Sequence, residues 1–302
     1  MAARKKEAEA ADTTSNGVTP VGTLKLIEGT GGGIAEKHLF IVPYGAPKVG
    51  KTFAAATLEP KRTKWLISDP NSLATLRAID RLPPKKHIYV VKSLTEARSV
   101  LGNFLDVADA ADQAGEIPAD VFDADALVVD SGTQFSDWHK EDVARETGQR
   151  WLGDNQKENG WDRFNHEFGG FVRDLTSLAR YIHVVLICHA NQKPNIQKGD
   201  WAGLSLSPQM SELVARSANW LLFMTARDLT EEHVVKLAGE AGLKGKNPFI
   251  AVVEGRGDEK RYTERVINTQ PVGGWNASAA GQKVKAEEPP SIRALLEKEG
   301  LL

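Results

Sequence analysis

The sequence predicts an α/β fold with a mostly parallel sheet flanked by helices. Two observations support this prediction. Short apolar segments alternate with helical segments along most of the chain, and none of the apolar segments approaches the roughly 20 residues of a membrane span. In addition, 41% of the residues are hydrophobic and 26% are charged, as in ordinary globular proteins. The length of 302 residues suits one large domain with appendages.

Charge and cysteine content exclude some classes of protein. The 38 Lys and Arg residues nearly balance the 40 Asp and Glu residues, which leaves a formal charge of −2. This balance excludes a histone-like protein that binds polyanions with its whole surface, but it permits a local basic groove. The single cysteine, Cys188, excludes an intrachain disulfide and a cysteine-based zinc site. We therefore expect a reducing, cytoplasmic setting and no membrane partner.

The predicted elements follow one another in chain order. A small, polar tail at 1–20 has no hydrophobic period and is predicted to be disordered, and a core domain at 21–272 begins with a weak edge strand at 23–28. Apolar runs that end at Gly, Pro or polar residues predict buried strands at 38–44, 64–69, 87–91, 126–130 and 182–188. Helical patterns predict helices at 51–58, 72–78, 93–108 and 164–181.

The C-terminal part of the chain is predicted to extend this sheet. Strands are expected at 220–226, 249–254 and 261–267, and the last two would form a β-hairpin. From residue 273 a linker leads to a short helix at 291–299. One segment of the core differs in charge: residues 106–125 carry seven acidic and no basic side chains, which predicts a solvated surface insertion.

One segment carries the most specific chemical motif. It matches G-x-x-x-x-G-K-[ST] at every position and lies between a predicted buried strand and a predicted helix. Its residues are Gly45, Ala46, Pro47, Lys48, Val49, Gly50, Lys51 and Thr52. Glycines let the backbone wrap a phosphate, successive N–H groups form an anion nest, and the following helix adds its N-terminal dipole. The motif therefore predicts a nucleotide-binding P-loop in which Lys51 reaches the β- and γ-phosphates of ATP.

A second motif predicts the magnesium site that such a loop needs. Four apolar residues precede Asp130, as in a Walker B strand, and a carboxylate at the carboxyl end of a strand lies beside the phosphate loop in such a sheet. We expect Thr52 to ligate Mg²⁺ through its hydroxyl and Asp130 to hold the ion through water. ATP and Mg²⁺ are thus the predicted cofactors.

The residue after Asp130 bears on the catalytic base. It is Ser131 rather than Glu, and the stretch Leu-Val-Val-Asp-Ser at 127–131 resembles the Walker B strand of RecA-like ATPases. The resemblance implies a RecA-like P-loop NTPase core. It also implies a water-activating carboxylate at the end of a neighbouring strand, and Asp69 is the residue that matches this position.

Other assignments stay open for these carboxylates. Asp69 precedes Pro70, so a helix-capping role is the alternative to catalysis. Asp137 and Glu141, in the helix predicted after the Walker B strand, are the rival bases.

The predicted strand at 182–188 is followed directly by a polar segment that contains His189 and Gln192. A polar residue at this strand end senses the γ-phosphate in RecA-like enzymes, so the resemblance implies that either residue could serve here. The strand followed by His, and the loop form Gly-x-Pro-Lys-x-Gly-Lys-Thr, resemble the Sak4-type phage nucleotide-binding AAA proteins. This resemblance covers approximately residues 40–267.

Two segments combine basic and aromatic side chains, at 148–166 and 193–207. Basic groups bind phosphates and aromatic rings stack on unpaired bases, so we expect these segments to bind DNA at one edge of the sheet. The candidate residues are Arg150, Trp151, Lys157, Trp161, Arg163, Lys193, Lys198 and Trp201. Burial of the tryptophans against the helix at 164–181 is the alternative.

Arg256 lies in Glu-Gly-Arg-Gly at 254–257, at the tip of the predicted hairpin. It belongs to a third basic cluster, with Lys244, Lys246, Lys260, Arg261 and Arg265. By resemblance to RecA-like filaments, Arg256 would be a finger that reaches the nucleotide of a neighbouring subunit. A solvated hairpin is the alternative.

These features predict an ATPase that acts on single-stranded DNA in phage recombination or replication, in the host cytoplasm. Its partners would be single-stranded DNA, further copies of the chain in an oligomer or filament, and a single-strand-binding protein. A P-loop ATPase with a protein client, such as an assembly or packaging factor, is an alternative that the acidic segment favours. A non-hydrolysing nucleotide-binding module and, with less support, a small-molecule kinase are the others.

Overall fold

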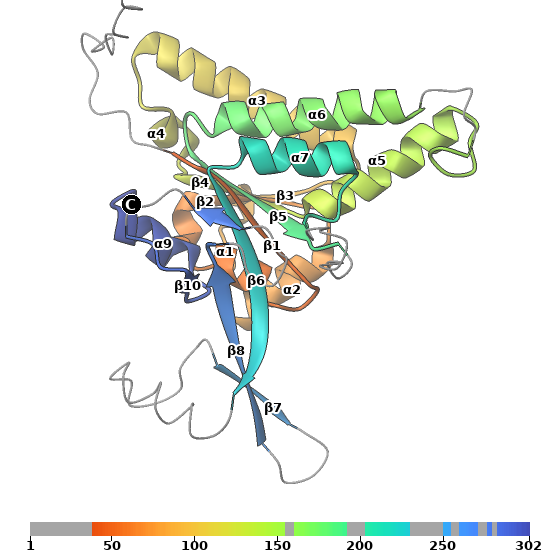
Figure 1. Cartoon of the computed structure of the whole chain (residues 1–302). Helices are drawn as coiled ribbons and strands as arrows, with labels where there is room; N and C mark the ends of the chain where they lie inside the picture. The colour runs from red at the N-terminus through yellow and green to blue at the C-terminus, as the bar shows by residue number, and fades with distance from the viewer. Residues whose placement is uncertain are drawn as a thin grey trace, which may run out of the picture. The chain divides into compact units, whose positions relative to one another are not determined.

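A mixed sheet forms the centre of the fold. The computed structural model describes residues 38–154, 160–191, 203–229, 250–254, 260–270, 277–279 and 283–302, and all of them belong to one compact unit. In this part of the chain, strands pair in the order β10–β8–β6–β1–β5–β4–β2–β3, with β7 beside β8 and β9 beside β6 (Figure 1).

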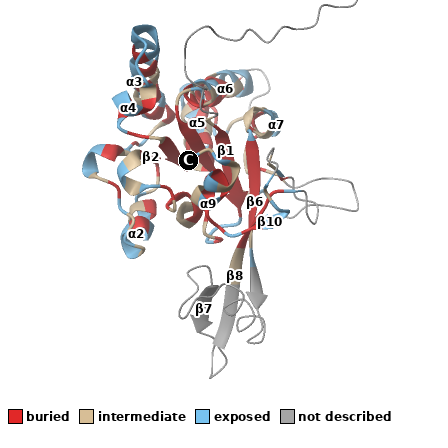
Figure 2. Cartoon of the chain, turned by 90° about the vertical axis from the view of Figure 1, so that its left-hand side faces the viewer, coloured by how far each residue is buried: buried red, intermediate tan, exposed pale blue. Residues whose placement is uncertain are grey.

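Six neighbouring strands, from β6 to β3 in this order, are parallel. They are β1 (Phe40–Gly45), β2 (Thr63–Ile67), β3 (Ile88–Val90), β4 (Ala126–Asp130), β5 (His183–His189) and β6 (Trp220–Leu229). Both faces of such strands are covered, which explains their continuous apolar runs; β1, β2 and β4 are buried throughout (Figure 2). The register pairs Gly45 with His189 and Ile67 with Asp130, so the carboxyl ends of four strands meet at one edge.

Antiparallel strands complete the sheet beyond β6. They are β7 (Ile250–Glu254), β8 (Lys260–Asn268), β9 (Ser278–Ala279) and β10 (Glu287–Glu288). Strand β8 pairs with β6, β7 and β10, and β9 pairs with β6. The prediction of a mostly parallel α/β sheet with a C-terminal β-hairpin is therefore confirmed.

Helices cover both faces of the sheet (Figure 1). On one face lie α3 (Leu94–Ala114), α5 (Gly132–Glu146), α6 (Gly160–Leu178) and α7 (Pro208–Ser217), with the short α4 (Pro118–Phe122) nearby. On the other lie α1 (Lys51–Ala55), α2 (Pro70–Ala78) and α9 (Ile292–Glu299). Helix α6 shows why these segments pack on the sheet: Phe164, Phe168 and Phe171 recur at helical spacing and are fully buried.

The acidic segment at 106–125 is helical over most of its length. Helix α3, expected to end near residue 108, runs to Ala114 because Gly115, at a φ of 72°, provides the left-handed residue that ends it. Helix α4 follows. Three carboxylates of the segment surround one guanidinium, since Arg62 lies 2.6 Å from Asp125 and 3.5 Å from both Asp120 and Asp123. Part of the acidic charge is thus compensated within the fold.

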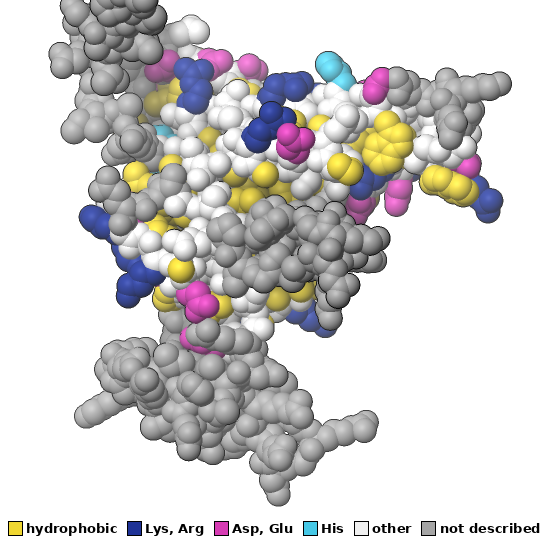
Figure 3. All heavy atoms as spheres, in the orientation of Figure 1, with side chains coloured by type: hydrophobic (Ala, Val, Ile, Leu, Met, Phe, Trp, Pro, Cys, Tyr) yellow, Lys and Arg dark blue, Asp and Glu magenta, His cyan; other side chains and the backbone are white. Residues whose placement is uncertain are grey.

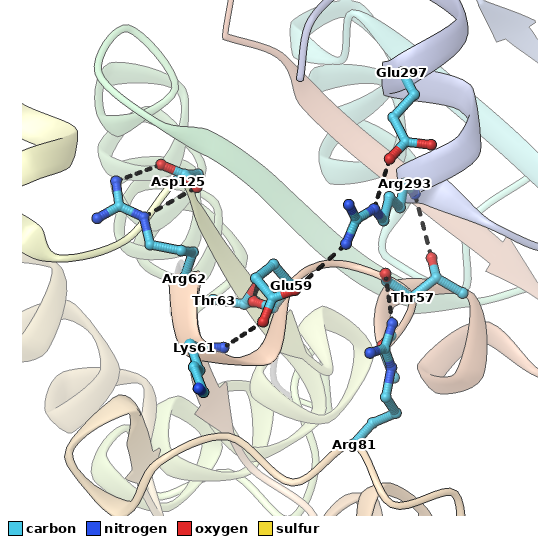
Figure 4. A network of polar contacts seen from close by, with 10 residues as sticks. Thr57, Glu59, Lys61, Arg62, Thr63, Arg81, Asp125, Arg293 and Glu297 are labelled. Atoms are coloured by element: carbon cyan, nitrogen blue, oxygen red, sulfur yellow. Dashed lines mark hydrogen bonds and ion pairs between the residues drawn. The ribbon is translucent and has the colours of Figure 1, made fainter.

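The C-terminal segment, expected to be a linker and a short helix, contributes β9, β10 and α9. Helix α9 begins after Ser291, whose hydroxyl accepts a hydrogen bond from the Ala294 amide, and it buries Leu296 against the core next to α1. Polar contacts fix its first turn (Figure 4). The Arg293 amide donates to the Thr57 hydroxyl at 3.2 Å, and its guanidinium lies 3.4 Å from Glu59. The C-terminal helix is therefore tied to the segment that comes after the P-loop helix.

The predicted tail at 1–20 and the edge strand at 23–28 lie outside the described residues. Among the helices that the structure describes, none combines the length and the apolar character that crossing a bilayer would require.

Replacement of Leu296 by Ala should destabilise the whole domain. Removing a fully buried leucine side chain costs about 2–5 kcal/mol of unfolding free energy, because apolar contacts are lost and a cavity remains. Urea unfolding measures this change. Leu302→Ala, at an exposed position nearby, is the matched control and should cost less than about 0.5 kcal/mol. Equal, small effects of both substitutions would show that α9 does not share the core.

Candidate functional site

A cavity of about 680 Å³ opens at the carboxyl edge of the parallel strands. Segments from five parts of the chain line it: the loop between β1 and α1 with the first turn of α1, α2 with the residues that flank it, the end of β4 with the start of α5, the end of β5, and β8. Ligands of open α/β sheets bind at this edge, where strand ends and helix N-termini converge. The P-loop and Walker B motifs both contribute residues to its walls.

The predicted P-loop forms the wall of the cavity next to β1. Lys48 and Gly50 adopt left-handed conformations, with φ of 66° and 95°, and so bend the loop back toward the helix. Gly45 must lack a side chain, because a Cβ there would lie 2.4 Å from the Met224 carbonyl oxygen. The Lys51 ammonium donates to the carbonyl oxygens of Gly45, at 3.0 Å, and Ala46, at 2.8 Å.

Lys51 is an unusually buried lysine, with 6% of its surface exposed. Burial lowers the pKa of its ammonium to about 8, against a weaker opposing attraction from Asp130. A phosphate group beside this side chain would stabilise the positively charged ammonium form that burial disfavours. The loop therefore presents an anion-binding cation at the N-terminus of α1.

Asp130, at the end of β4, lies across the cavity floor from the loop. Its Oδ2 accepts hydrogen bonds from the hydroxyls of Thr52 and Ser72, both at 2.8 Å. Burial raises the pKa of this carboxyl, while the two hydroxyl donors act in the opposite direction. The predicted metal pair, Thr52 and Asp130, is thus in direct contact.

A serine hydroxyl fixes the backbone next to this carboxylate. The Ser68 hydroxyl donates to the Asp130 carbonyl at 3.1 Å and accepts from the Ser131 amide at 2.9 Å. Ser131 then caps α5 through the Gln134 amide, at 3.3 Å. Neither Ser68 nor Ser72 was predicted from the sequence, although Ser72 lies only three residues after Asp69.

Asp69 also lines the cavity and caps α2. Its Oδ1 accepts from the Asn71 amide at 2.9 Å, so the capping interpretation holds for this residue. The rival carboxylates do not line the cavity: Asp137 pairs with Lys140 at 3.0 Å, although its charge still acts on the cavity residue His189, and Glu141 lines a different hollow. Of the three carboxylates considered as bases, only Asp69 borders the cavity.

His189 projects into the same cavity from the end of β5. Its amide donates to the Thr133 hydroxyl at 2.9 Å, and its Nδ1 is buried without a hydrogen-bond partner in the described part of the chain. Burial and the neighbouring Lys51 charge lower the pKa of the imidazole, so the ring is neutral at pH 7. Gln192 and Arg256 lie outside the described residues.

Arg265, in β8, is a cavity residue to which the sequence assigns no individual role. The sequence pattern places it in a basic cluster and favours Arg256 as the functional arginine. The register of β8 against β6, in which Arg265 pairs with Ala226, brings its side chain to Gly50 of the P-loop. The only sequence signal was a cation in a strand that continues the sheet.

A second hollow, of about 650 Å³, lies at the far end of α5. Two predicted DNA-binding tryptophans line it, and they remain 56% exposed at Trp151 and 39% exposed at Trp161. Lys140, Arg145 and Arg150 line the same hollow. We call this surface the tryptophan groove; apolar and charged side chains gather at this end of the molecule (Figure 3).

The location of the tryptophan groove corrects one expectation. The segment was predicted to leave the sheet edge beside the P-loop, but the 15 residues of α5 carry it about 22 Å away from Asp130. Arg163, a predicted DNA contact, instead pairs with Glu167 at 2.9 Å and with Glu146, and does not line the groove. Lys157, Lys193, Lys198 and Trp201 lie outside the described residues.

Comparison with known proteins identifies the family. Residues 37–249 match a protein family described as an AAA domain. The chain belongs to this AAA domain family. The match supports a nucleotide-binding domain of the P-loop ATPase type, and the P-loop motif of this domain borders the cavity. No curated protein matches the chain.

Solved structures share parts of the AAA domain's fold at low sequence identity. An ATPase from the type III secretion system of pathogenic bacteria is 12% identical, with a TM-score of 0.39 over 66% of this chain and 53% of that one. The chain thus spans about half the length of that protein. The flagellar accessory protein FlaH from Methanocaldococcus jannaschii is 10% identical, with a TM-score of 0.34 over 64% of this chain and 74% of that one.

The affinity of the AAA domain for ATP should fall as the pH rises above about 8. In the free protein the Lys51 amine is neutral above this pH, whereas a bound triphosphate favours the ammonium, so binding must take up a proton. Kd should then rise by up to about tenfold per pH unit. Titration with a fluorescent ATP analogue between pH 7 and 9.5 measures this. Lys51→Arg, which stays charged, should give a flat profile, and identical slopes in both proteins would contradict the assignment.

Proposed function

We propose that this chain hydrolyses ATP with Mg²⁺ and couples the reaction to the binding of single-stranded DNA, as an oligomer, in phage recombination or replication. The observation that carries the proposal is the path of one helix. Gln134, near the start of α5, lines the nucleotide cavity, and Lys140, Ala144 and Arg145, toward its end, line the tryptophan groove.

The oxygen donors at the end of β4 fit a magnesium ion. Mg²⁺ prefers hard oxygen ligands and keeps several waters, so one hydroxyl and one carboxylate beside the phosphates suffice. Thr52 and Asp130 offer this pair, and no larger cluster of metal-ligating side chains occurs among the described residues. Bound there, the ion would neutralise charge on the β- and γ-phosphates. Lys51 would add a second positive charge.

Asp69 is the proposed general base. It borders the cavity, and a carboxylate at this position can accept a proton from the attacking water and orient it. Capping α2 does not conflict with this role, because the cap uses Oδ1 and leaves the second oxygen for water. His189, neutral and with a buried Nδ1 that lacks a partner in the described residues, is the proposed γ-phosphate sensor; Gln192 is the alternative.

The tryptophan groove is the proposed contact with single-stranded DNA. An exposed ring can stack on a base of any identity, and nearby cations neutralise phosphates. The Arg150 guanidinium lies 5.7 Å from the centroid of the Trp151 ring, so charge and stacking surface adjoin. Lys157, Lys193, Lys198 and Trp201 are proposed to extend this contact, and Arg256 is proposed to reach the nucleotide of a neighbouring subunit.

The helix α5 would connect the two sites. Its first turn is fixed through Ser131 and Ser68 to the backbone of Asp130, so a shift of the Walker B strand on γ-phosphate loss would move the helix as a unit. Its last turns would carry that motion to the groove. A helix transmits displacement along its axis because its backbone hydrogen bonds make it stiff over this length.

Replacement of Asp69 by Asn should lower kcat by about 10²–10⁴-fold while ATP binding changes little. Asn caps helices as well as Asp does, so α2 should remain intact. Steady-state phosphate release and nucleotide titration separate the two effects. Glu141→Gln and Asp137→Asn are the matched controls and should turn over at the wild-type rate. A loss of turnover in either control, with normal turnover in Asp69→Asn, would identify a different base.

Replacement of Trp151 by Ala should weaken binding of single-stranded DNA by about 1–3 kcal/mol, because a stacking surface is lost. Arg150→Ala should flatten the dependence of log K on log salt by about 0.7 for each DNA phosphate that the arginine no longer neutralises. Fluorescence anisotropy with a labelled oligonucleotide, in ATP and in ADP, measures both quantities. Ile117→Ala, at an exposed apolar position away from the groove, is the control for loss of apolar surface.

The ATPase rate with and without oligonucleotide tests the coupling. We expect stimulation in the wild-type protein and a smaller stimulation in Trp151→Ala. If the wild-type protein hydrolyses ATP but neither binds nor responds to DNA at low salt, the DNA proposal fails and a protein client becomes the better hypothesis.

A further inference from the structure

The side chain of Arg265 lies flat against the P-loop. If Gly50 carried a Cβ, that atom would be 2.7 Å from Cδ of Arg265, 3.2 Å from its Nε and 3.7 Å from its Cζ. The φ of 95° favours glycine at position 50, and the absence of a side chain there leaves room for the end of the arginine side chain. The guanidinium thus reaches the loop that cradles the phosphates, within the same cavity as Lys51 and Asp130.

The strand that carries Arg265 is held firmly at this point. Its neighbour Val266 pairs with Thr225 of β6, and Asn268 donates to the Phe223 carbonyl at 3.0 Å. Strand β6 in turn pairs in parallel with β1, which leads into the P-loop. The strand pairings β8–β6 and β6–β1 therefore fix the distance between the Arg265 backbone and the P-loop within one chain.

The charge of Arg265 is not used by the fold in the part that the structure describes. None of the described acidic side chains forms an ion pair with it, although Asp69 and Asp130 line the same cavity. A guanidinium keeps its charge over the whole working pH range, and its planar fork matches two phosphate oxygens at once.

We propose that Arg265 binds the phosphate chain of the nucleotide held by its own P-loop, as a second cation supplied in cis from β8. This inference rests on nucleotide binding at the cavity, but not on hydrolysis or on DNA. It gives the C-terminal hairpin an arginine that acts on the nucleotide of its own chain, in addition to Arg256, which is proposed to reach the nucleotide of a neighbouring subunit.

Arg265→Gln is the sharpest test, because glutamine keeps part of the packing over Gly50 and removes the charge. We expect Kd for ATP and for ADP, measured by titration with fluorescent analogues at pH 7, to rise by about 10- to 100-fold, the loss expected for a charged hydrogen bond. Arg265→Lys should recover part of the loss. Arg216→Gln, which removes the same charge from an exposed site on α7, should bind like wild type.

Thermal unfolding separates phosphate binding from a structural role, because a variant that loses only a phosphate contact should unfold like wild type. An unchanged Kd in Arg265→Gln, with normal thermal unfolding, would overturn the proposal. If wild type itself failed to bind nucleotide, the assignment of the cavity would fail instead.

A measurement on the unmodified protein keeps the proposal testable if the variants fold poorly. Arginine residues can be modified with phenylglyoxal and located by peptide mass spectrometry. We expect MgATP to protect Arg265 at least severalfold, while modification of Arg216 stays constant. Equal modification of Arg265 with and without MgATP would overturn the proposal.

Discussion

The structure depends on one buried carboxylate. Asp130 ends the central strand β4 and is 6% exposed, so its charge is largely removed from water. Burying a carboxylate costs several kcal/mol unless donors compensate, and here the hydroxyls of Thr52 and Ser72 do so at 2.8 Å each. These donors come from α1 and α2. The same interaction therefore positions the P-loop helix, the helix that bears Asp69, and the strand end between them.

Backbone conformation and side-chain contact combine at the P-loop. The left-handed residues Lys48 and Gly50 bend the loop, while the Lys51 ammonium donates hydrogen bonds to the carbonyls of Gly45 and Ala46. The ammonium thus holds the loop in its curved form and at the same time carries the charge that recognises an anion. A loop held in this form would need little rearrangement when a phosphate replaces the two carbonyl groups as the partner of the ammonium, so preorganisation would favour binding.

The sequence was sufficient for the parts of the site that are local in the chain. The P-loop motif and the apolar run before Asp130 each specify a strand end and the turn or helix after it, so the cavity walls built by β1 and β4 were predictable. The positions of Ser72 and Arg265 in the cavity were not predictable, because they depend on how a helix packs and how a strand pairs with segments far away in the sequence. The position of Trp151 was misjudged for a related reason: periodicity indicates a helix after Asp130, but it does not show how far a helix of 15 residues carries the chain from the sheet edge.

The length of α5 also fixes the angle, measured about the helix axis, between the side chains at its two ends. Each residue of an α-helix turns the next side chain by about 100° and advances it by about 1.5 Å. Deleting one residue from the middle of α5 would hardly shorten it, yet it would rotate the groove-lining residues by more than a quarter turn relative to Gln134 and the nucleotide cavity. An insertion of seven residues would lengthen the helix by about 10 Å and nearly preserve the facing of both sites. The proposed coupling between the two hollows would thus be governed by helical phase more strictly than by separation.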